Sequence, residues 1–378
     1  MVLFRIKGVP VKIGLSWVVI FALVFWSLAA AMFPSTYPGL SVWAYVAMAG
    51  VATLLFFASI LVHELSHTLQ SLREGVKVRD ITLWLFGGVS RAEEPLPGPG
   101  AEFRVVAAGP LASGVLALLF WGLATGGAAL GLPETWTGVP RYLAGINGLL
   151  LAFNVVPALP LDGGRLLHAL LWWRSGDDAG ATIIAARAGQ LFAVVLIAAG
   201  VFVTLTRTNL SGIWFVLLGW FIGQAARQEA QGARVTQALR GQRVRDLMAA
   251  APITLRPDTT LDEVAVLLQQ GLSHPVYPVV DDGRFAGLLV LRRAGRVPVS
   301  QRGTTLVGDL MERADAVPVL HPEDLVVDAV PTLARAPGRA VVLAADLGQV
   351  VGILSESDLV RALELTPDGD PGRRTDAH

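Results

Sequence analysis

The sequence of 378 residues contains no cysteine, only six histidines and few charged residues, and each shortage narrows what the chain can be. Without cysteine there are no disulfides, no thiolate zinc ligands and no cysteine nucleophile, so any metal must be held by His, Asp or Glu. The 30 basic and 30 acidic residues cancel, which leaves no electrostatic footprint for nucleic acid. With 53% apolar and only 16% charged residues, the chain is too apolar for an ordinary soluble enzyme.

The apolar residues are concentrated before about residue 225, in runs of the length that crosses a bilayer as a helix. We therefore predict a polytopic α-helical membrane domain over residues 1–225, a helical linker at 226–243 and a soluble part behind it. The six predicted spans lie at about residues 15–33, 43–72, 103–130, 142–173, 189–205 and 213–223.

The distribution of Lys and Arg predicts the orientation of these spans. Basic residues gather in the N-terminal segment and in alternate loops, and such loops stay on the cytoplasmic side. The three alanines at residues 29–31 would also suit a signal-peptide cleavage site, but five more runs follow, which favours a span. An even number of spans places both termini in the cytoplasm, in a multi-pass protein of the cell membrane.

The second run carries two imidazoles and a carboxylate in the sequence HELSH. His63 and His67 are four residues apart, so on a helix both rings project from one face, with Glu64 beside them. This is the HExxH zinc signature, and ionisable groups inside an apolar span indicate a functional site. Catalytic zinc usually has three protein ligands and one open position for water, so a third ligand is required.

Two alternatives for the third ligand remain open at this point. The metzincin position is excluded, because Arg73 stands where that class has histidine. Glu93 and Glu94 lie in the loop after the second run, whereas Asp162, in FNVVPALPLDGGR, is the only carboxylate in the fourth run. An unpaired aspartate at that depth is costly, but a metal ion compensates its charge, and this favours Asp162.

Proline and glycine around Asp162 predict a broken helix. Pro157 and Pro160 lack backbone donors and interrupt the fourth run, and the glycine pair after Asp162 lets other backbone approach. Such a break is tolerated at membrane depth where it lines a polar cavity. His168, beside a Trp pair, is interpreted as an interfacial side chain rather than a fourth ligand.

HELSH in one run and NVVPALPLDGG in another resemble the paired motifs of the site-2 protease family of intramembrane zinc metalloproteases. FGGVS and AAGPLASG resemble other recurrent stretches of that family, and the resemblance covers about residues 1–225. It implies one zinc ion held by His63, His67 and Asp162, with Glu64 as the general base.

The resemblance also implies how a substrate is held and which proteins are cut. Asn154 would support the oxyanion or position the substrate, and a plain interhelical hydrogen bond is the alternative role. The stretch around Gly87 and Gly88 predicts a β-hairpin or two short strands, which would hold an unwound substrate segment; a loop packed on the membrane is the alternative. The substrate would be a single-spanning membrane protein, such as an anti-sigma factor or a membrane-tethered regulator.

The soluble part contains an internal repeat. DLM at residues 246–248 recurs 63 residues later at 309–311, and AGLL recurs 65 residues later as VGIL. The repeat resembles a tandem pair of CBS domains, α/β modules at residues 244–298 and 306–365. The tail at 366–378 is predicted to be disordered.

In CBS pairs an adenine nucleotide often binds between the copies, with an Asp at the ribose and a Ser or Thr three residues earlier at the phosphates. The second copy has Ser355 and Asp358 at these places, whereas the first has Val290 and Arg293. The resemblance therefore implies at most one standard nucleotide site. The alternative is a structural or dimerising module, and the resemblance also leads us to expect a homodimer through the CBS pair.

These observations predict an intramembrane zinc metalloprotease that cuts within or near the membrane helix of its substrate and is modulated by cytoplasmic CBS domains. The rival hypotheses are a CBS-regulated transporter or channel and a catalytically silent membrane receptor. A transporter should spread its ionisable residues along a path, whereas here they gather at one metal-like site. A silent receptor need not retain Glu64 and all three ligand candidates.

Overall fold

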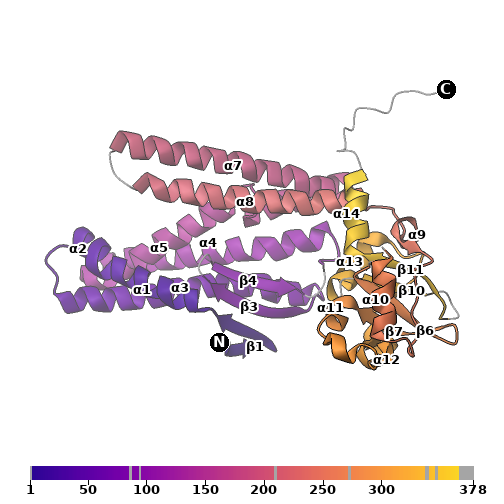
Figure 1. The fold of residues 1–378 in the computed structure, drawn as a ribbon. Helices are drawn as coiled ribbons and strands as arrows, with labels where there is room; N and C mark the ends of the chain where they lie inside the picture. Colours follow the sequence, from indigo (N-terminus) through magenta and orange to yellow (C-terminus); the bar gives the residue numbers. More distant parts are fainter. Residues whose placement is uncertain are drawn as a thin grey trace, which may run out of the picture. The chain divides into compact units, whose positions relative to one another are not determined.

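The apolar runs of the first half of the sequence form long α-helices in the computed structural model (Figure 1). The structure describes residues 2–84, 87–92, 95–207, 211–270, 274–336, 340–344 and 348–365. The chain divides into two compact units, Met1–Ala233 and Arg234–His378. Four described stretches are helical and long and apolar enough to cross a membrane: Ser16–Thr36, Val42–Arg73, Pro99–Ala129 and Asp178–Thr206.

The other two predicted spans differ from single long apolar helices. The fourth is divided into α5 (Glu134–Asn154) and α6 (Asp162–Ser175), because Pro157 and Pro160 interrupt it as predicted. α8 (Ser211–Ala238) begins in the sixth run and continues through most of the segment predicted to be a linker. None of the three is among the four stretches above, so length and composition support four spans in the described residues rather than six.

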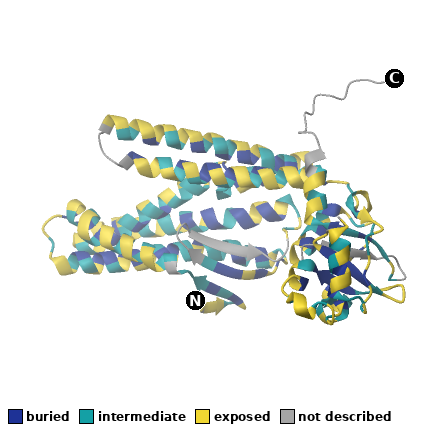
Figure 2. Cartoon of the chain, in the orientation of Figure 1, coloured by how far each residue is buried: buried dark blue, intermediate teal, exposed yellow. Residues whose placement is uncertain are grey.

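Apolar side chains cover the outside of the long helices. Trp26, Trp121 and Phe202 are among the large apolar residues that are exposed, and Figure 2 shows exposed residues along α7 and α8. So large an exposed apolar surface suits a lipid environment. The other helical elements of this unit are α1 (Leu15–Ser27), the π-helical turn η1 (Leu28–Met32), α2 (Phe33–Thr36), α3 (Val42–Arg73), α4 (Pro99–Ala129) and α7 (Asp178–Arg207).

A four-stranded sheet in the order β1-β2-β3-β4 lies against α3 (Figure 1). The predicted strand pair forms β3 (Val78–Trp84) and β4 (Gly87–Ala92), which are antiparallel. An N-terminal hairpin of β1 (Val2–Ile6) and β2 (Val9–Ile13), which the sequence analysis did not predict, adds β2 in parallel to β3. The buried side chains Val9, Val11, Val78 and Ile81 of the sheet pack against Leu61, Leu65 and Leu72 of α3.

The second unit consists of two α/β copies that exchange a short strand. β5 (Ala249–Ala250) belongs to the first copy but pairs with β11 (Val350–Ser355) of the second. β8 (Glu312–Arg313) belongs to the second copy but pairs with β7 (Arg284–Val290) of the first. The two sheets have the orders β5-β11-β10-β9 and β6-β7-β8, so each is completed by the other copy.

The hairpin between β6 (Val276–Asp281) and β7 turns at Asp282 and Gly283. Both have positive φ, 46° and 78°, as a two-residue hairpin turn requires. The other elements of this unit are α9 (Val244–Leu247), α10 (Leu261–Gln269), α11 (Leu291–Ala294), η2 (Val299–Gln301), α12 (Val307–Leu310), η3 (Ala314–Ala316), β9 (Val319–Leu320), α13 (Val326–Arg335), β10 (Ala340–Ala344) and α14 (Glu356–Leu365). The tail predicted to be disordered lies outside the described residues.

The repeated DLM motif has a structural role in the strand exchange. In each copy its methionine lies over a glycine of the other copy, Met248 over Gly352 and Met311 over Gly287. A Cβ added at Gly287 would lie 3.0 Å from the Met311 sulfur and would collide with the carbonyl of Glu312 in the exchanged strand. The glycine of AGLL and VGIL therefore makes room for the exchanged strand.

We expect Gly287→Ala to destabilise the second unit by roughly 1–3 kcal/mol, because the added methyl group cannot fit beside the exchanged strand. Thermal unfolding of the purified full chain in detergent measures the loss. Gly295→Ala is the matched control, since the nearest atom to an added Cβ there is the Leu291 carbonyl oxygen at 3.5 Å. Equal unfolding temperatures for both variants would contradict the proposed role of Gly287.

Candidate metal centre

His63 and His67 face each other across one turn of α3. Their Nε2 atoms are 3.2 Å apart, and their side chains are only 6% and 14% exposed. α3 begins after Ser41, whose side chain accepts a hydrogen bond from the backbone of Ala44, and runs unbroken for 32 residues. The predicted spacing of two imidazoles on one helix face is therefore confirmed.

Asp162 brings the third side chain to this point from the start of α6. Its Oδ2 atom lies 3.2 Å from His63 Nε2 and 3.4 Å from His67 Nε2. Glycine is needed immediately after it, because a Cβ at Gly163 or Gly164 would collide with backbone of the preceding loop. The glycine pair therefore lets α6 begin close against that loop, with Asp162 directed at the histidines.

The geometry of these three atoms fits a metal ion. Four tetrahedral ligands at zinc distances of about 2.0–2.1 Å stand about 3.3–3.4 Å from one another, close to the separations found here. His67 Nδ1 donates to the carbonyl of Val105 at 2.9 Å, so its Nε2 presents a lone pair to the cluster. Asp162 Oδ2 is buried and has no hydrogen-bond partner among the described residues. A cation between them would compensate electron-pair donors that converge in a buried site.

α4 supplies three positions at the centre that the sequence analysis did not single out. Ser113 Oγ lies 2.9 Å from His63 Nδ1, and the Val105 carbonyl accepts from His67. Gly109 lies between them on the helix, and a Cβ there would collide with His67 Nε2 and stand 2.8 Å from His63 Nε2. All three lie in or just before the stretch AAGPLASG. Their spacing of four residues puts them on one face of a helix, and this was the signal in the sequence that could have revealed them. α4 thus orients both imidazoles and leaves space in front of them.

Two further predicted site residues, Glu64 and Asn154, lie on α3 and α5. Glu64 is half-buried on α3, and its backbone carbonyl accepts from Thr68. Asn154 is half-buried at the last position of α5. The interhelical hydrogen bond considered for it is made by Asn147 instead, two turns earlier, which is buried and donates to Ser59 on α3 at 3.3 Å.

Gly87 and Gly88 lie at the start of β4, paired with the end of β3. β4 is the last strand of its sheet in the described part of the chain, and it lies alongside α3. A strand edge therefore runs next to the helix that carries His63 and His67. The alternative metal ligands Glu93 and Glu94 lie outside the described residues.

His168 requires a correction. The ring is buried inside the helical unit rather than placed at an interface, and Nδ1 lies 2.8 Å from Glu102 Oε2. It is not part of the metal cluster, as expected, because the cluster found in the described residues consists of His63, His67 and Asp162. The periodicity of α6 alone did not reveal that a carboxylate of α4 faces His168.

A surface ion pair joins the two helices that build the centre. Arg104, near the start of α4, donates two hydrogen bonds of 2.8 and 2.7 Å to the carboxylate of Glu74, just after α3. This hydrogen-bonded guanidinium lowers the pKa of Glu74 to about 2. The pair is therefore charged at any physiological pH and links the C-terminal end of α3 to the N-terminal end of α4.

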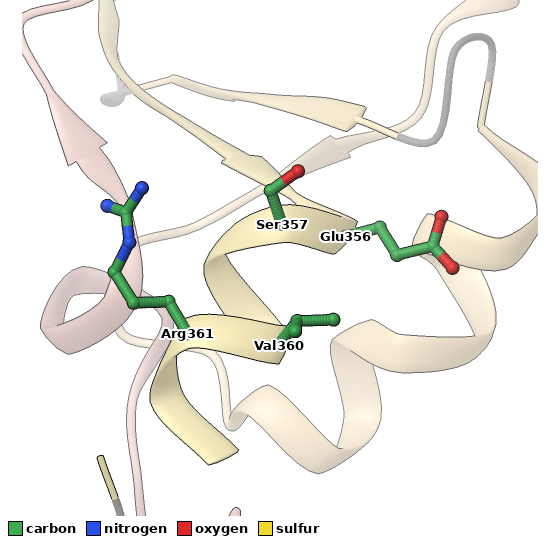
Figure 3. Close-up of a pocket in the computed structure, with 4 residues that line it drawn as sticks. All are labelled: Glu356, Ser357, Val360 and Arg361. Carbon is green, nitrogen blue, oxygen red and sulfur yellow. The ribbon is translucent and has the colours of Figure 1, made fainter. Parts of the chain in front are cut away.

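The residues predicted to bind a nucleotide lie where β11 passes into α14. The backbone N–H and the hydroxyl of Ser355 both donate to Asp358 Oδ2, at 2.9 and 2.6 Å, so Asp358 caps the helix. In the first copy, Arg293 instead forms an ion pair with Glu312 of the exchanged strand. A pocket of about 450 Å³ on α14 is lined by Glu356, Ser357, Val360 and Arg361 (Figure 3).

Comparisons with known proteins agree with both halves of the chain. The model of Peptidase family M50 matches residues 51–136 and 132–198, and that of the CBS domain matches 244–294 and 307–365. A protein of Mycobacterium tuberculosis named zinc metalloprotease Rip3 is 38% identical over 362 residues, which are 96% of this chain and 92% of that protein. A zinc metalloprotease of Synechocystis sp. is 28% identical over 94% of this chain and 93% of its own length. The solved site-2 protease from Methanocaldococcus jannaschii is 27% identical, covers 61% of this chain and 94% of its own, and has a TM-score of 0.41.

We expect Gly109→Ala to abolish or strongly weaken zinc binding, because a methyl group at this position would occupy the space in front of both imidazoles. Zinc affinity of the purified chain is measured by competition with a chromogenic chelator. Gly126→Ala, on the same helix but with no atom within 4 Å of an added Cβ, should bind zinc as the native chain does. Native zinc affinity in Gly109→Ala would show that the metal lies elsewhere.

Proposed function

Because the chain belongs to peptidase family M50 and continues into a tandem CBS pair, we propose that it is an intramembrane zinc metalloprotease whose cytoplasmic CBS domains modulate it. It would hydrolyse peptide bonds within or near the membrane helix of a membrane-anchored substrate. The observation that carries this proposal is the convergence of His63, His67 and Asp162, whose ligand atoms all lie within 4.8 Å of one another.

In this proposal His63, His67 and Asp162 hold one zinc ion. Bound zinc supplies a Lewis acid and lowers the pKa of a water molecule to about 7. Glu64 is the neighbour of a ligand histidine and has a carboxylate that can accept the proton of the attacking water. The same carboxylate then delivers that proton to the leaving amine, so the base becomes the acid in the second half of the reaction.

The substrate would be held as an extended segment beside the metal centre. The outer edge of β4, which includes Gly87 and Gly88, runs next to α3 and can add one more strand through backbone hydrogen bonds. A helical substrate must unwind to expose its peptide bonds, and a strand edge stabilises the unwound form. Asn154, half-buried at the end of α5 and eight residues before Asp162, would support the oxyanion or position the substrate.

We extend the four described apolar stretches to six crossings by adding α5 with α6 and α8. The break between α5 and α6 then lies at membrane depth, where it lines the polar centre. Both termini would be cytoplasmic, in agreement with the distribution of basic residues. The substrate class that fits is a single-spanning membrane protein, such as an anti-sigma factor or a membrane-tethered regulator, whose cytoplasmic fragment is released by the cut.

The CBS pair would bind one adenine nucleotide at its second copy and associate as a homodimer. Ser355 and Asp358 hydrogen-bond only to each other in the bonds found there, whereas Arg293 in the first copy forms an ion pair with Glu312 of the exchanged strand. A nucleotide that hydrogen-bonds to the Asp358 carboxylate would replace its bond from the Ser355 backbone and so change the cap of α14. This gives the soluble unit a way to respond to the nucleotide.

Glu64→Gln should abolish cleavage while zinc stays bound, because the amide keeps the shape of the side chain but cannot accept the proton. The expected loss is at least about 100-fold. The measurement is proteolysis of a single-span test protein that the native chain cuts in detergent, together with zinc content. Glu134→Gln, an exposed carboxylate in the first turn of α5, is the control and should cut normally. Retained cleavage in Glu64→Gln would remove its role as base.

Asp358→Asn should lower the affinity for AMP or ATP by about tenfold or more, since hydrogen bonds to a charged group are the stronger ones. Isothermal titration of the full chain with each nucleotide tests this. Asp309→Asn is the matched control, because Asp309 accepts the same kind of cap bond, from Leu306 N at 3.2 Å, but belongs to no nucleotide site. If both variants bind a nucleotide as tightly as the native chain, Asp358 does not contact it.

A further inference from the structure

A second group of ionisable side chains lies inside the helical unit, apart from the metal ligands. His168 on α6 faces Glu102 in the first turn of α4 and Asp178 at the start of α7. The side chains of His168 and Glu102 are each only 9% exposed, and Nδ1 is 2.8 Å from Glu102 Oε2. Nε2 is 3.2 Å from both the carbonyl oxygen and Oδ1 of Asp178. Burying ionisable side chains costs free energy unless their charges are paired. The pairing of His168 with Glu102 and Asp178 therefore needs a structural explanation.

The partners of His168 determine the state of its ring. Glu102 offers a carboxylate oxygen, and Asp178 offers a backbone carbonyl and a carboxylate, all of which are acceptors. Nε2 therefore donates to Asp178, and Nδ1 and Glu102 Oε2 share one proton between them. Such charge-assisted hydrogen bonds are short and directional, and they hold a helix more strictly than apolar contacts do.

Glu102 belongs to the face of α4 that serves the metal centre. Along this face lie Glu102, Val105, Gly109 and Ser113, at spacings of three, four and four residues. Val105 and Ser113 hydrogen-bond to the two ligand histidines, and Gly109 leaves room for them. Glu102 contacts His168 of α6, the helix that supplies the third ligand.

α6 packs against α4 and α7, and Leu167 adds an apolar contact. Its buried residues are Gly163, Gly164, His168 and Ala169, so His168 is the one buried side chain of this helix that forms directional bonds. It lies six residues after Asp162, about 9 Å along the axis at 1.5 Å per residue. A shift or rotation of α6 at His168 therefore moves Asp162 relative to the histidines of α3.

We propose that Glu102 and His168 form a positioning pair that fixes α6 against α4 and thereby sets Asp162 at the distance a metal ion requires. α4 then orients all three ligands, two through direct hydrogen bonds and the third through this pair. The inference rests on the proposed zinc site, but neither residue belongs to the cluster of His63, His67 and Asp162. The groups that hold ligands in place are commonly as important for metal affinity as the ligands themselves.

The test is a double-mutant cycle on zinc affinity. The native full chain, Glu102→Gln, His168→Gln and the double variant are titrated with zinc in detergent against a chromogenic chelator. We expect each single variant to bind zinc about tenfold or more weakly. The double variant should bind zinc no more weakly than the weaker-binding single variant, because both substitutions break the same hydrogen-bonded pair. Glu102→Asp keeps the charge but moves the carboxylate back by one carbon, so its zinc affinity should lie between those of the native chain and Glu102→Gln. It replaces Glu102→Gln in the test if that variant does not fold.

Asp80→Asn separates positioning from general stability. Asp80 forms another ion pair of the helical unit, 2.7 Å from Lys12, with its own side chain 3% exposed, but it joins β2 to β3 instead of reaching α6. This variant should lower the unfolding temperature while zinc affinity stays native. If Glu102→Gln and His168→Gln likewise lose stability but keep native zinc affinity, the pair is merely structural and the inference falls. A native chain that binds no zinc would overturn the proposed function itself, and with it this inference.

Discussion

The metal centre depends on one electrostatic constraint, which is that two imidazole nitrogens and a carboxylate oxygen point at one another inside an apolar helical unit. Their separations of 3.2–3.4 Å are unfavourable for lone pairs alone and suit ligands that share a cation. The constraint accounts for features that otherwise look unrelated. The glycine pair after Asp162 lets α6 start against its own loop, and Gly109 leaves the space in front of the imidazoles.

α4 works as a template for this centre because apolar helices alone do not specify their mutual register well. Contacts between aliphatic side chains tolerate small shifts, whereas hydrogen bonds do not. Three polar groups of α4 act in this way: Ser113 and the Val105 carbonyl contact the ligand histidines, and Glu102 contacts His168. The Arg104–Glu74 pair adds a surface tie between α3 and α4.

In the second unit, the exchange of short strands holds the two copies together. Because each copy gives a strand to the sheet of the other, neither sheet is complete within its own stretch of sequence. The exchange makes the two copies one folding unit while still allowing them to differ in chemistry. At equivalent positions Arg293 is engaged with Glu312 of the exchanged strand, whereas Asp358 only caps its own helix. The shared sheets therefore couple the packing of one copy to that of the other.

The sequence by itself determined the elements whose signals are local. HELSH put two imidazoles on one helix face, the prolines before Asp162 broke the fourth run, and Asp282-Gly283 made a hairpin turn, because periodicity and backbone preference act within a few residues. It did not reveal the β1–β2 hairpin, the continuation of α8 through the predicted linker or the strand exchange, since such packing and pairing leave little local trace. Only the tertiary structure decided that Gly109 and Ser113 face the histidines and that His168 meets Glu102, 66 residues away. Those contacts depend on how α3, α4 and α6 pack, and packing is a property of the whole unit.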